Sequence, residues 1–512
     1  MKRGDDTGDA RDGYDLVVVG GGINGAGVAR DAAGRGLRVL LCEQHDLAAH
    51  TSSASTKLVH GGLRYLEFYD FSLVRKSLLE REVLMAAAPH ISWPLRFVLP
   101  HDSHLRPRWM IRAGLFLYDH LARRRRLPGS ESIDLRRHPA GQPLEARYRS
   151  GFVYSDGWID DARLVVLNAL DAQQRGATVL TRTKCVHAER RGSGWVVTLE
   201  QVGGVERKVT ARALVNAAGP WVAQFLDEAT DVPAGHHPRM IKGSHIVVPK
   251  LFDHEFAYLF QAPDGRVVFA IPYEREFTLI GTTERDYDDD LATPGIDGAE
   301  IDYLLAMGNR YFARDLTRAD VVWTFAGLRP LLATSHDDPK SVTRDYVIEL
   351  DTQGPPLLSI YGGKVTTYRK LAEDVVGELA PLLACPGSPW TAREPLPGGD
   401  LPDGDFARFR AHLAQRHPWL PDRMLERCAH AYGTRIELML AGARSLDDLG
   451  EEVLPGVYQA EIDYLRREEW AVSAADILWR RTKLGLVTPR DAESRLDFWI
   501  ATHPLAGTRA TA

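Results

Sequence analysis

The chain has 512 residues, of which 44% are hydrophobic and 26% charged, and its formal net charge is −6. This composition is typical of a globular protein of two to four domains and excludes a disordered or fibrous chain, while the small net charge argues against a nucleic-acid partner. The four cysteines (Cys42, Cys185, Cys385 and Cys428) form no CxxC pair, so we expect no disulfide framework, no metal site and a reducing, cytoplasmic compartment.

Residues 1–13 are polar and charged. Because they contain no apolar segment, we expect a disordered N-terminal extension and no signal peptide. No later apolar stretch reaches the roughly 18–20 residues of a membrane-spanning helix. The sequence therefore predicts a protein that does not span a membrane but can lie on one.

The folded part begins with a strand, a glycine-rich turn, a helix and a second strand. An apolar strand is predicted over 14–19, a helix over 26–35, and a second apolar strand over 38–42, which ends at Glu43. This order predicts a Rossmann-like dinucleotide-binding domain in which Glu43 binds a pair of ribose hydroxyls.

The turn between the first strand and the helix has the pattern G-x-G-x-x-G. We expect Gly20 to permit the tight turn, Gly22 to let the backbone approach a pyrophosphate, and Gly25 to let the helix pack closely on the strand. The N-terminus of the helix then offers unpaired N–H groups to the phosphates.

Two features favour FAD over NAD. The first is a loop rich in hydroxyl groups and glycine after Glu43, whose candidate cofactor-binding residues are Thr51, Ser52, Ser53, Lys57, Gly61 and Gly62. The second is a strand over 213–216 that ends in Ala-Ala-Gly-Pro-Trp, with Gly219 and Trp221 as candidates. No second G-x-G-x-x-G follows, so electrons are expected to come from an organic substrate and to leave to oxygen, a quinone or a carrier.

Further along the chain, residues 243–249, 266–272 and 277–283 predict an antiparallel sheet of a second domain. A strand over 357–361 then runs into glycines before a helix over 366–379. The N-terminus of that helix is a second place for a phosphate or a flavin carbonyl, with Gly363, Lys364 and Thr366 as candidates.

A stretch rich in proline and glycine, 395–404, precedes residues with helical periodicity. The predicted fold class is α/β, with a Rossmann-like FAD-binding domain, an inserted antiparallel-sheet substrate domain and a C-terminal α-helical domain. The oxidoreductase region is expected over 14–394, its discontinuous substrate domain over roughly 70–150 and 220–355, and the helical domain over 395–512.

The segment 105–126 carries seven arginines against the single acid Asp119, with apolar residues between them. An apolar body with basic flanks is typical of a helix that lies in a membrane interface. A partly buried helix with a solvated arginine cluster has the same pattern, and the sequence leaves both interpretations open.

Eight stretches of the sequence form recognisable motifs: 20–27, 51–66, 106–121, 241–249, 327–331, 343–346, 362–373 and 478–485. Together they resemble one family, the FAD-dependent (respiratory, aerobic) glycerol-3-phosphate dehydrogenases. Departures are Ala218, where the family often has threonine, and Glu284, where aspartate is usual. The resemblance covers nearly the whole chain after residue 13.

The resemblance implies the roles of several site residues. Arg329, Arg344 and Arg64 with Tyr65 are candidates for binding the substrate phosphate, and Lys364 for holding a substrate oxygen or stabilising reduced flavin. The candidate base is His245, whose imidazole suits proton abstraction near pH 7. A buried structural histidine is the alternative for His245, and His60 competes for the role of base.

The resemblance also implies oxidation of sn-glycerol 3-phosphate to dihydroxyacetone phosphate by noncovalently bound FAD. A membrane quinone is the expected electron acceptor, and the expected location is the cytoplasmic face of the membrane, with peripheral attachment. An oxidase that uses oxygen and a non-catalytic FAD-binding sensor or scaffold remain as alternatives. A homodimer is left open.

Overall fold

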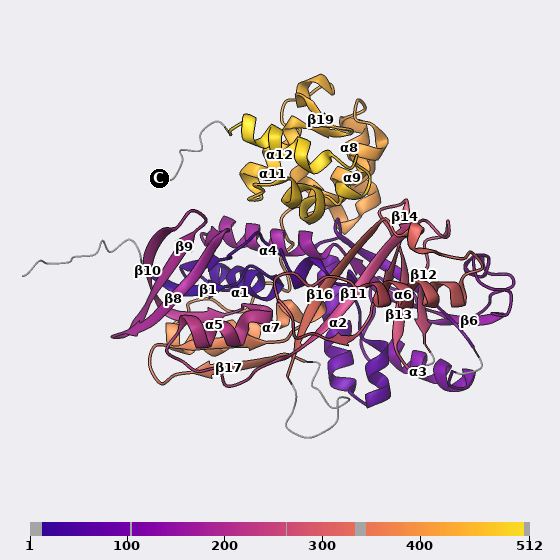
Figure 1. Ribbon diagram of the computed structural model, residues 1–512, viewed down its shortest axis with the longest axis horizontal. Helices are drawn as coiled ribbons and strands as arrows, with labels where there is room; N and C mark the ends of the chain where they lie inside the picture. The colour runs from indigo at the N-terminus through magenta and orange to yellow at the C-terminus, as the bar shows by residue number, and fades with distance from the viewer. Residues whose placement is uncertain (1–12, 103–104, 263, 333–344, 506–512) are drawn as a thin grey trace, which may run out of the picture.

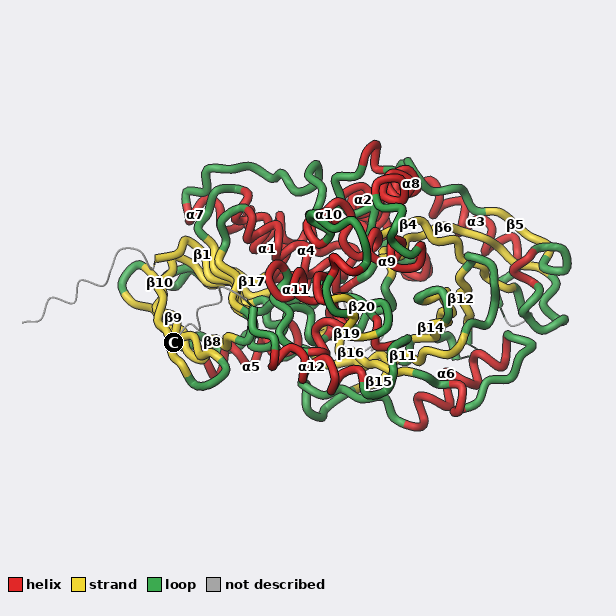
Figure 2. Tube along the Cα trace, turned by 90° about the horizontal axis from the view of Figure 1, so that it is seen from above, coloured by secondary structure: helices red, strands yellow, loops and turns green. Residues whose placement is uncertain are grey.

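The computed structural model describes residues 13–102, 105–262, 264–332 and 345–505. Two β-sheets lie side by side, one toward each end of the long axis, and the C-terminal helices lie over the junction between them (Figure 1). The view from above also shows the C-terminal helices over the junction and the adjoining part of the second sheet (Figure 2). The α/β fold class predicted from the sequence is confirmed.

The first sheet is built around a parallel core. β1 (Gly13–Val19) pairs with β2 and β10, β2 pairs with β7, and β10 pairs with β18, all in parallel. The partners are β2 (Val39–Cys42), β7 (Thr178–Leu180), β10 (Val205–Asn216) and β18 (Leu357–Tyr361). β17 (Val347–Asp351) pairs antiparallel with β18, and β8 (Thr183–Arg191) and β9 (Gly194–Gln201) extend the sheet beside β10. The carboxyl ends of five parallel strands therefore meet at one edge.

Both faces of this sheet are buried. Leu16 and Val18 of β1 belong to one core, with α1 (Ile23–Gly34), α4 (Asp161–Gln174) and α7 (Tyr368–Leu383). Val17 and Val19 belong to a second core, to which β8, β9 and α5 (Val222–Ala229) contribute. This double burial explains why the strand is apolar at consecutive positions.

The second sheet is antiparallel except for the pair β4–β12, which is parallel. Its strands are β3 (Leu58–Val59), β4 (Ser92–Pro100), β5 (Glu131–Asp134), β6 (Ser150–Ile159), β11 (Arg239–Pro249), β12 (Ala257–Gln261), β13 (Val267–Tyr273), β14 (Phe277–Gly281), β15 (Arg285–Asp286) and β16 (Trp323–Leu331). Helix α6 (Gly298–Tyr311) packs on one face, and α2 (Phe71–Ala87) and α3 (Arg108–His120) pack on the other. The sheet draws strands from 58–59 and 150–159, so it extends beyond the range of roughly 70–150 expected from the sequence.

The C-terminal residues form a helical unit with its own hydrophobic core. Its elements are α8 (Phe406–Arg416), α9 (Asp422–Tyr432), α10 (Ile436–Met439), α11 (Gln459–Glu468), η10 (Asp476–Arg481) and α12 (Ala492–Thr502). It also contains a short hairpin, β19 (Glu452–Leu454) and β20 (Val457–Tyr458), that the sequence analysis did not predict.

Buried ion pairs fix this unit on the first sheet and the helix α4 that packs on it. Arg163 of α4 donates to both carboxylate oxygens of Glu469, and Arg481 does the same to Asp46, which follows β2. All four side chains are at most 2% exposed. Removing one partner of such a pair would leave an uncompensated buried charge.

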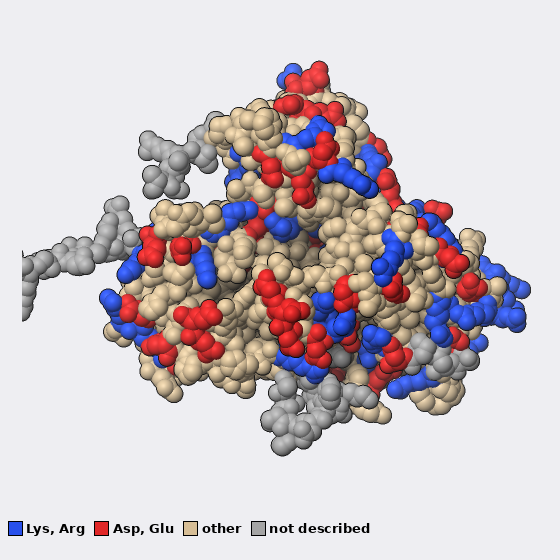
Figure 3. All heavy atoms as spheres, viewed as in Figure 1, with Lys and Arg blue, Asp and Glu red and all other residues tan. Residues whose placement is uncertain are grey.

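Basic and acidic side chains are interspersed over the face shown in Figure 3. Among the described residues, no helix is long and apolar enough to cross a bilayer.

Candidate active site

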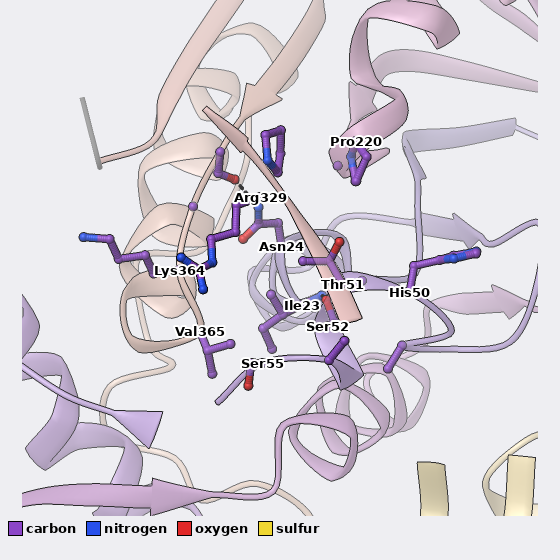
Figure 4. A pocket seen from close by; sticks show the side chains of 18 of the residues that line it. Ile23, Asn24, His50, Thr51, Ser52, Ser55, Pro220, Arg329, Lys364 and Val365 are labelled. Atoms are coloured by element: carbon purple, nitrogen blue, oxygen red, sulfur yellow. Dashed lines mark hydrogen bonds between the residues drawn. The ribbon is translucent and has the colours of Figure 1, made fainter. Parts of the chain in front are cut away.

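A cavity of about 630 Å³ lies between the two sheets. Its walls are the carboxyl ends of β1, β2, β10 and β18, the loop after β2, and the inner face of the second sheet. Arg329, Lys364 and Asn24 lie on one side of the cavity, and His50 and Pro220 lie on the opposite side (Figure 4). In open parallel sheets, ligands bind at this edge.

The glycines of the first turn are required by close backbone contacts. Gly20 has φ +111°, and a Cβ there would lie 2.5 Å from the carbonyl oxygen of Ala217. A Cβ on Gly25 would lie 1.9 Å from the carbonyl oxygen of Gly20. Gly22 precedes α1 and lines the cavity, so the helix begins at the cavity wall with no side chain of its own N-cap covering it. This is the geometry of an anion site at a helix N-terminus.

Glu43 lies where the sequence analysis placed the ribose-binding acid. Its carboxylate accepts the backbone N–H of Gly21 at 2.6 Å and that of His45 at 2.8 Å, and it lines the cavity. Burial raises its pKa. Each carboxylate oxygen retains a lone pair beyond these bonds, which suits the acceptance of ribose hydroxyls.

The loop after β2 contributes in two different ways. Thr51, Ser52 and Gly62 line the cavity, and the Ser52 hydroxyl accepts the N–H of Ile23 at the start of α1. Ser53, Lys57 and Gly61 do not line it; the Lys57 ammonium is fully buried against Asp161 Oδ1 (2.8 Å) and the Ser53 carbonyl. Of the six candidates in this loop, three face the cavity and three support the loop from behind.

Two buried polar atoms of the cavity wall lack hydrogen-bond partners. Within the described part of the chain, Asn24 Oδ1 and Lys364 Nζ are buried and accept or donate no hydrogen bond. The Asn24 amide donates to the carbonyl of Gly362 (3.0 Å), and Gly362 and Gly363 both have positive φ. Unsatisfied buried groups are costly, so this wall fits a polar cofactor. Gly219, Trp221, Gly363 and Thr366 also line the cavity.

His245 projects from β11 into the same cavity wall. Its Nε2 lies 3.0 Å from Thr56 Oγ1, and the residue is 1% exposed. Its partner in β14 is Gly281, and only glycine fits at that position, because a Cβ there would lie 2.0 Å from His245 Cδ2. Burial, then the charges of Arg329 and Lys57, hold the pKa of His245 well below its usual value. The ring is therefore neutral near pH 7.

Arg329 lies on β16, on the same side as His245. Two facing glycines, Gly243 of β11 and Gly327 of β16, separate the ring from the guanidinium along the strands. Among the described residues, the guanidinium makes two long contacts, 3.4 Å to Glu284 Oε1 and 3.5 Å to Thr282 Oγ1, and it lines the cavity. The gap between a neutral imidazole and a weakly held cation is suited to a small anionic substrate.

The remaining candidates are distributed as follows. Arg64 and Tyr65 line the cavity, and the Lys364 ammonium lies 4.1 Å from the centre of the Tyr65 ring. His60 lines the cavity too; its backbone N–H donates to Thr366 Oγ1, and burial lowers the pKa of its ring. Arg344 lies outside the described residues.

Sequence reasoning missed Asn24, Thr56 and Thr282. Asn24 is the polar residue inside the first glycine motif, and Thr56 adjoins residues already selected, so both positions carried a signal. Thr282 approaches Arg329 only because β14 and β16 both pair with β11. No spacing along the chain reveals that contact.

Comparisons with known proteins show what the chain is similar to. Residues 15–369 match the family model described as FAD dependent oxidoreductase, and residues 389–501 match the C-terminal domain of alpha-glycerophosphate oxidase. The chain is 53% identical over 494 residues to a glycerol-3-phosphate dehydrogenase of Pseudomonas aeruginosa, covering 96% of each chain. It is 50% identical over 471 residues to a D-erythritol 1-phosphate dehydrogenase of Brucella abortus, covering 92% of this chain and 94% of that one.

A solved structure is similar over nearly the full length. The glycerol-3-phosphate dehydrogenase of Bacillus halodurans, determined in complex with FAD, has 29% identity and a TM-score of 0.78, covering 96% of this chain and 91% of that one.

Proposed function

The chain belongs to the FAD-dependent oxidoreductase family, and we propose that it oxidises sn-glycerol 3-phosphate to dihydroxyacetone phosphate and passes the electrons to a membrane quinone. The substrate proposal rests on the space between the neutral imidazole of His245 and the guanidinium of Arg329. Both groups line the cavity whose other residues fit a dinucleotide. The family's cofactor is FAD, and the residues present fit it: the open N-terminus of α1, the Glu43 carboxylate and the unsatisfied Asn24 and Lys364 atoms.

When bound, FAD supplies the electrophilic ring atom that takes a hydride. The chain itself supplies cations for the phosphate and a base for the hydroxyl group. Arg329 can donate a fork of N–H groups to phosphate oxygens, and Lys364 and Arg64, which also line the cavity, add positive charge. These cations orient the C2 carbon of the substrate.

The C2 hydroxyl proton goes to the hydrogen-bonded pair His245–Thr56. Burial, and then the charges of Arg329 and Lys57, lower the pKa of His245 and make its protonation unfavourable in the free protein. A phosphate dianion bound at Arg329 offsets that positive field and favours the imidazolium. Substrate binding therefore prepares the base as well as the geometry.

Anaerobic mixing with sn-glycerol 3-phosphate tests the substrate. We expect the flavin absorbance near 450 nm to bleach at a rate on the order of 1–1,000 s⁻¹, the usual range of turnover. D-Erythritol 1-phosphate is the sharpest comparison, because it also carries a phosphate and hydroxyl groups. A faster reduction by D-erythritol 1-phosphate would transfer the proposal to that substrate, and no bleaching by either would favour the sensor or scaffold.

The acceptor proposal is supported by an apolar wall that a polar substrate does not need. Phe97, Tyr154, Leu259 and Phe269 line the cavity from the inner face of the second sheet. Phe97 stacks on Tyr154 with ring centres 5.3 Å apart and contacts Phe269 edge-on at 5.7 Å. Such a surface suits an apolar ring such as a quinone. Reoxidation of the reduced protein by a soluble quinone, faster than by oxygen, is the expected result; the reverse would favour the oxidase.

Membrane attachment is supported by the exposed aromatic residues of α3 and the turn before α2. Trp109 and Phe116 of α3 are 71% and 57% exposed, and Tyr69 is 79% exposed, while Leu115 and Tyr118 anchor the helix in the core. Large exposed apolar surface with basic neighbours is typical of a membrane-facing patch.

The aromatic residues are cleaner probes of attachment than the arginine cluster, because Arg124 pairs with Asp119 and Arg126 donates to the Gly404 carbonyl. Trp109→Ser with Phe116→Ser should abolish flotation with vesicles of phosphatidylglycerol and phosphatidylcholine. Phe498→Ser is the matched control, since Phe498 is 72% exposed on α12. Equal binding by the double variant and the control would reject α3 as the attachment surface.

A further inference from the structure

A column of four aromatic rings runs from the C-terminal unit to the cavity. Trp479 of η10 stacks on Trp323 of β16, with ring centres 4.6 Å apart and planes 17° apart. Trp323 packs on Phe325 at 5.0 Å, and Phe325 stacks on the His245 ring at 4.7 Å and 11°. The column therefore joins a residue of the C-terminal unit to the candidate base.

The middle of the column is set by the register of the second sheet. Trp323 and Phe325 are two residues apart on β16, so their side chains lie on the same face of the sheet. Phe325 lies directly opposite His245 in the pairing of β16 with β11, and Trp323 lies opposite Val247. The sheet thus places Phe325 against His245 and brings Trp323 toward the C-terminal unit.

The outer end of the column is held by the C-terminal unit. The Trp479 indole N–H donates to Glu493 Oε1 at 2.5 Å, and a Cβ on Gly485 would lie 2.4 Å from the indole. The Arg481 guanidinium, two residues along, donates to Asp46 Oδ1 at 2.8 Å. Trp479 is therefore fixed both to its own unit and, through η10, to the nucleotide-binding sheet.

Hydrogen bonds restrain the His245 ring only in part. Within the described part of the chain, the ring makes one hydrogen bond, to Thr56 Oγ1, and its Nδ1 has no partner. One hydrogen bond at Nε2 does not fix the plane of the ring, so packing sets it: the ring lies close to Gly281 and stacks face to face on Phe325.

We propose that Trp479 is a positioning residue for the oxidation, which holds the His245 ring in its reactive plane through Trp323 and Phe325. The inference rests on the proposed function only in taking His245 as the base. It gives the C-terminal unit a defined part in the chemistry at the cavity. Removing Trp479 leaves one face of Trp323 unpacked, and the rings behind it lose their fixed stacking.

The test is flavin reduction by sn-glycerol 3-phosphate in anaerobic stopped flow, measured across pH. The charged groups around His245 are Arg329 on β16 with its partner Glu284, and Lys57 with its partner Asp161. These groups remain in every variant of the column. A shift of the acidic limb of the pH profile in a variant would therefore indicate a changed environment of the His245 ring.

For Trp479→Ala we expect the reduction rate to fall about tenfold or more, since small misplacement of a reacting group costs up to roughly a hundredfold. Its acidic limb should shift toward higher pH as water reaches the ring. FAD content and the substrate Kd should stay within about twofold. Trp479→Phe, which keeps an aromatic ring without the indole N–H, should recover most of the rate.

Trp499→Ala is the matched control. Trp499 is another tryptophan of the C-terminal unit, buried where Trp479 is partly buried; its indole N–H donates to Glu451 Oε2 (2.7 Å), and it stacks on His503 outside the column. It should lower stability without moving the pH profile. An equal effect of Trp499→Ala and Trp479→Ala on rate and pH profile would overturn the proposal, as would a normal rate and profile in Trp479→Ala.

Two further variants keep the outcome decisive. If Trp479→Ala loses FAD, Trp323→Leu breaks the same column from within the second sheet and is judged by the same criteria. His245→Asn separates the two hypotheses: a normal rate in this variant rejects His245 as the base and with it the proposal. A slow His245→Asn combined with a normal Trp479→Ala rejects the positioning role alone.

Discussion

Replacement of Arg329 by alanine should raise the KM for sn-glycerol 3-phosphate far more than it changes FAD content. A charge-assisted hydrogen bond contributes about 1.5–3 kcal/mol, and each 1.4 kcal/mol corresponds to about a tenfold change. The side chain of Arg329 is 40% exposed and Glu284 competes for it at 3.4 Å. Both facts favour the lower half of that range, which corresponds to an increase in KM of about ten- to fortyfold.

The assay pairs steady-state kinetics with the substrate Kd from flavin absorbance, because KM equals Kd only when chemistry is slow. Two companion variants sharpen it. Arg329→Lys keeps the charge but loses the guanidinium fork, so it should fall between wild type and Arg329→Ala. Glu284→Gln removes the carboxylate that lies beside the guanidinium, so the KM should fall a few-fold.

Glycerol, which lacks the phosphate, is the control substrate. If Arg329 binds phosphate, its loss should leave the weak oxidation of glycerol nearly unchanged. The reasoning is refuted if Arg329→Ala loses as much activity toward glycerol as toward sn-glycerol 3-phosphate, or if Glu284→Gln raises the KM.

Three further expectations follow from buried contacts. Gly25→Ala should strip FAD from the protein, measured as the flavin-to-protein absorbance ratio, whereas Gly114→Ala, with nothing within 4 Å of its Cβ, should keep it. Glu469→Ala should lower the free energy of unfolding in urea by about 3–5 kcal/mol, because it leaves the buried charge of Arg163 uncompensated. The double variant Arg163→Met with Glu469→Leu should recover most of the lost stability. An unchanged urea midpoint in Glu469→Ala would contradict the prediction. Burial lowers the pKa of His90 to about 3, so the contribution of the neutral ring to stability is present above pH 6.5 and is lost as the pH falls toward 3, at up to about 1.4 kcal/mol per pH unit. His90→Asn should make the free energy of unfolding less dependent on pH in this range. An equally steep pH dependence in this variant would assign the effect to other groups.

The nucleotide-binding half could be predicted because its determinants are local. Strand, turn, helix and acid follow one another within Gly13–Glu43, and each has a sequence signal. The second sheet could be predicted only in outline. β3, β4 and β6 come from distant parts of the chain, and β4 pairs in parallel with β12, which no short-range pattern indicates.

The same distinction separates the site residues. Glu43, Gly20 and Gly25 follow from spacing, since one turn imposes their roles. Lys57 and Gly61 belong to the predicted loop, yet they support it from behind, because the buried carboxylates of Asp161 and Asp156 bind them. Whether a loop residue faces the cavity or the core depends on partners more than ninety positions away, which the sequence does not reveal.

In the proposed mechanism, the electrostatics of the cavity link phosphate recognition to proton transfer. Burial lowers the pKa of His245, the charge of Arg329 lowers it further, and the fully buried Lys57 adds to the effect from behind. A substrate without a phosphate leaves this positive field in place, so the imidazolium that must form is opposed. A phosphate dianion at Arg329 reverses the sign of the nearest charge. Discrimination against glycerol then arises twice, in binding and in the proton-transfer step, from the same guanidinium.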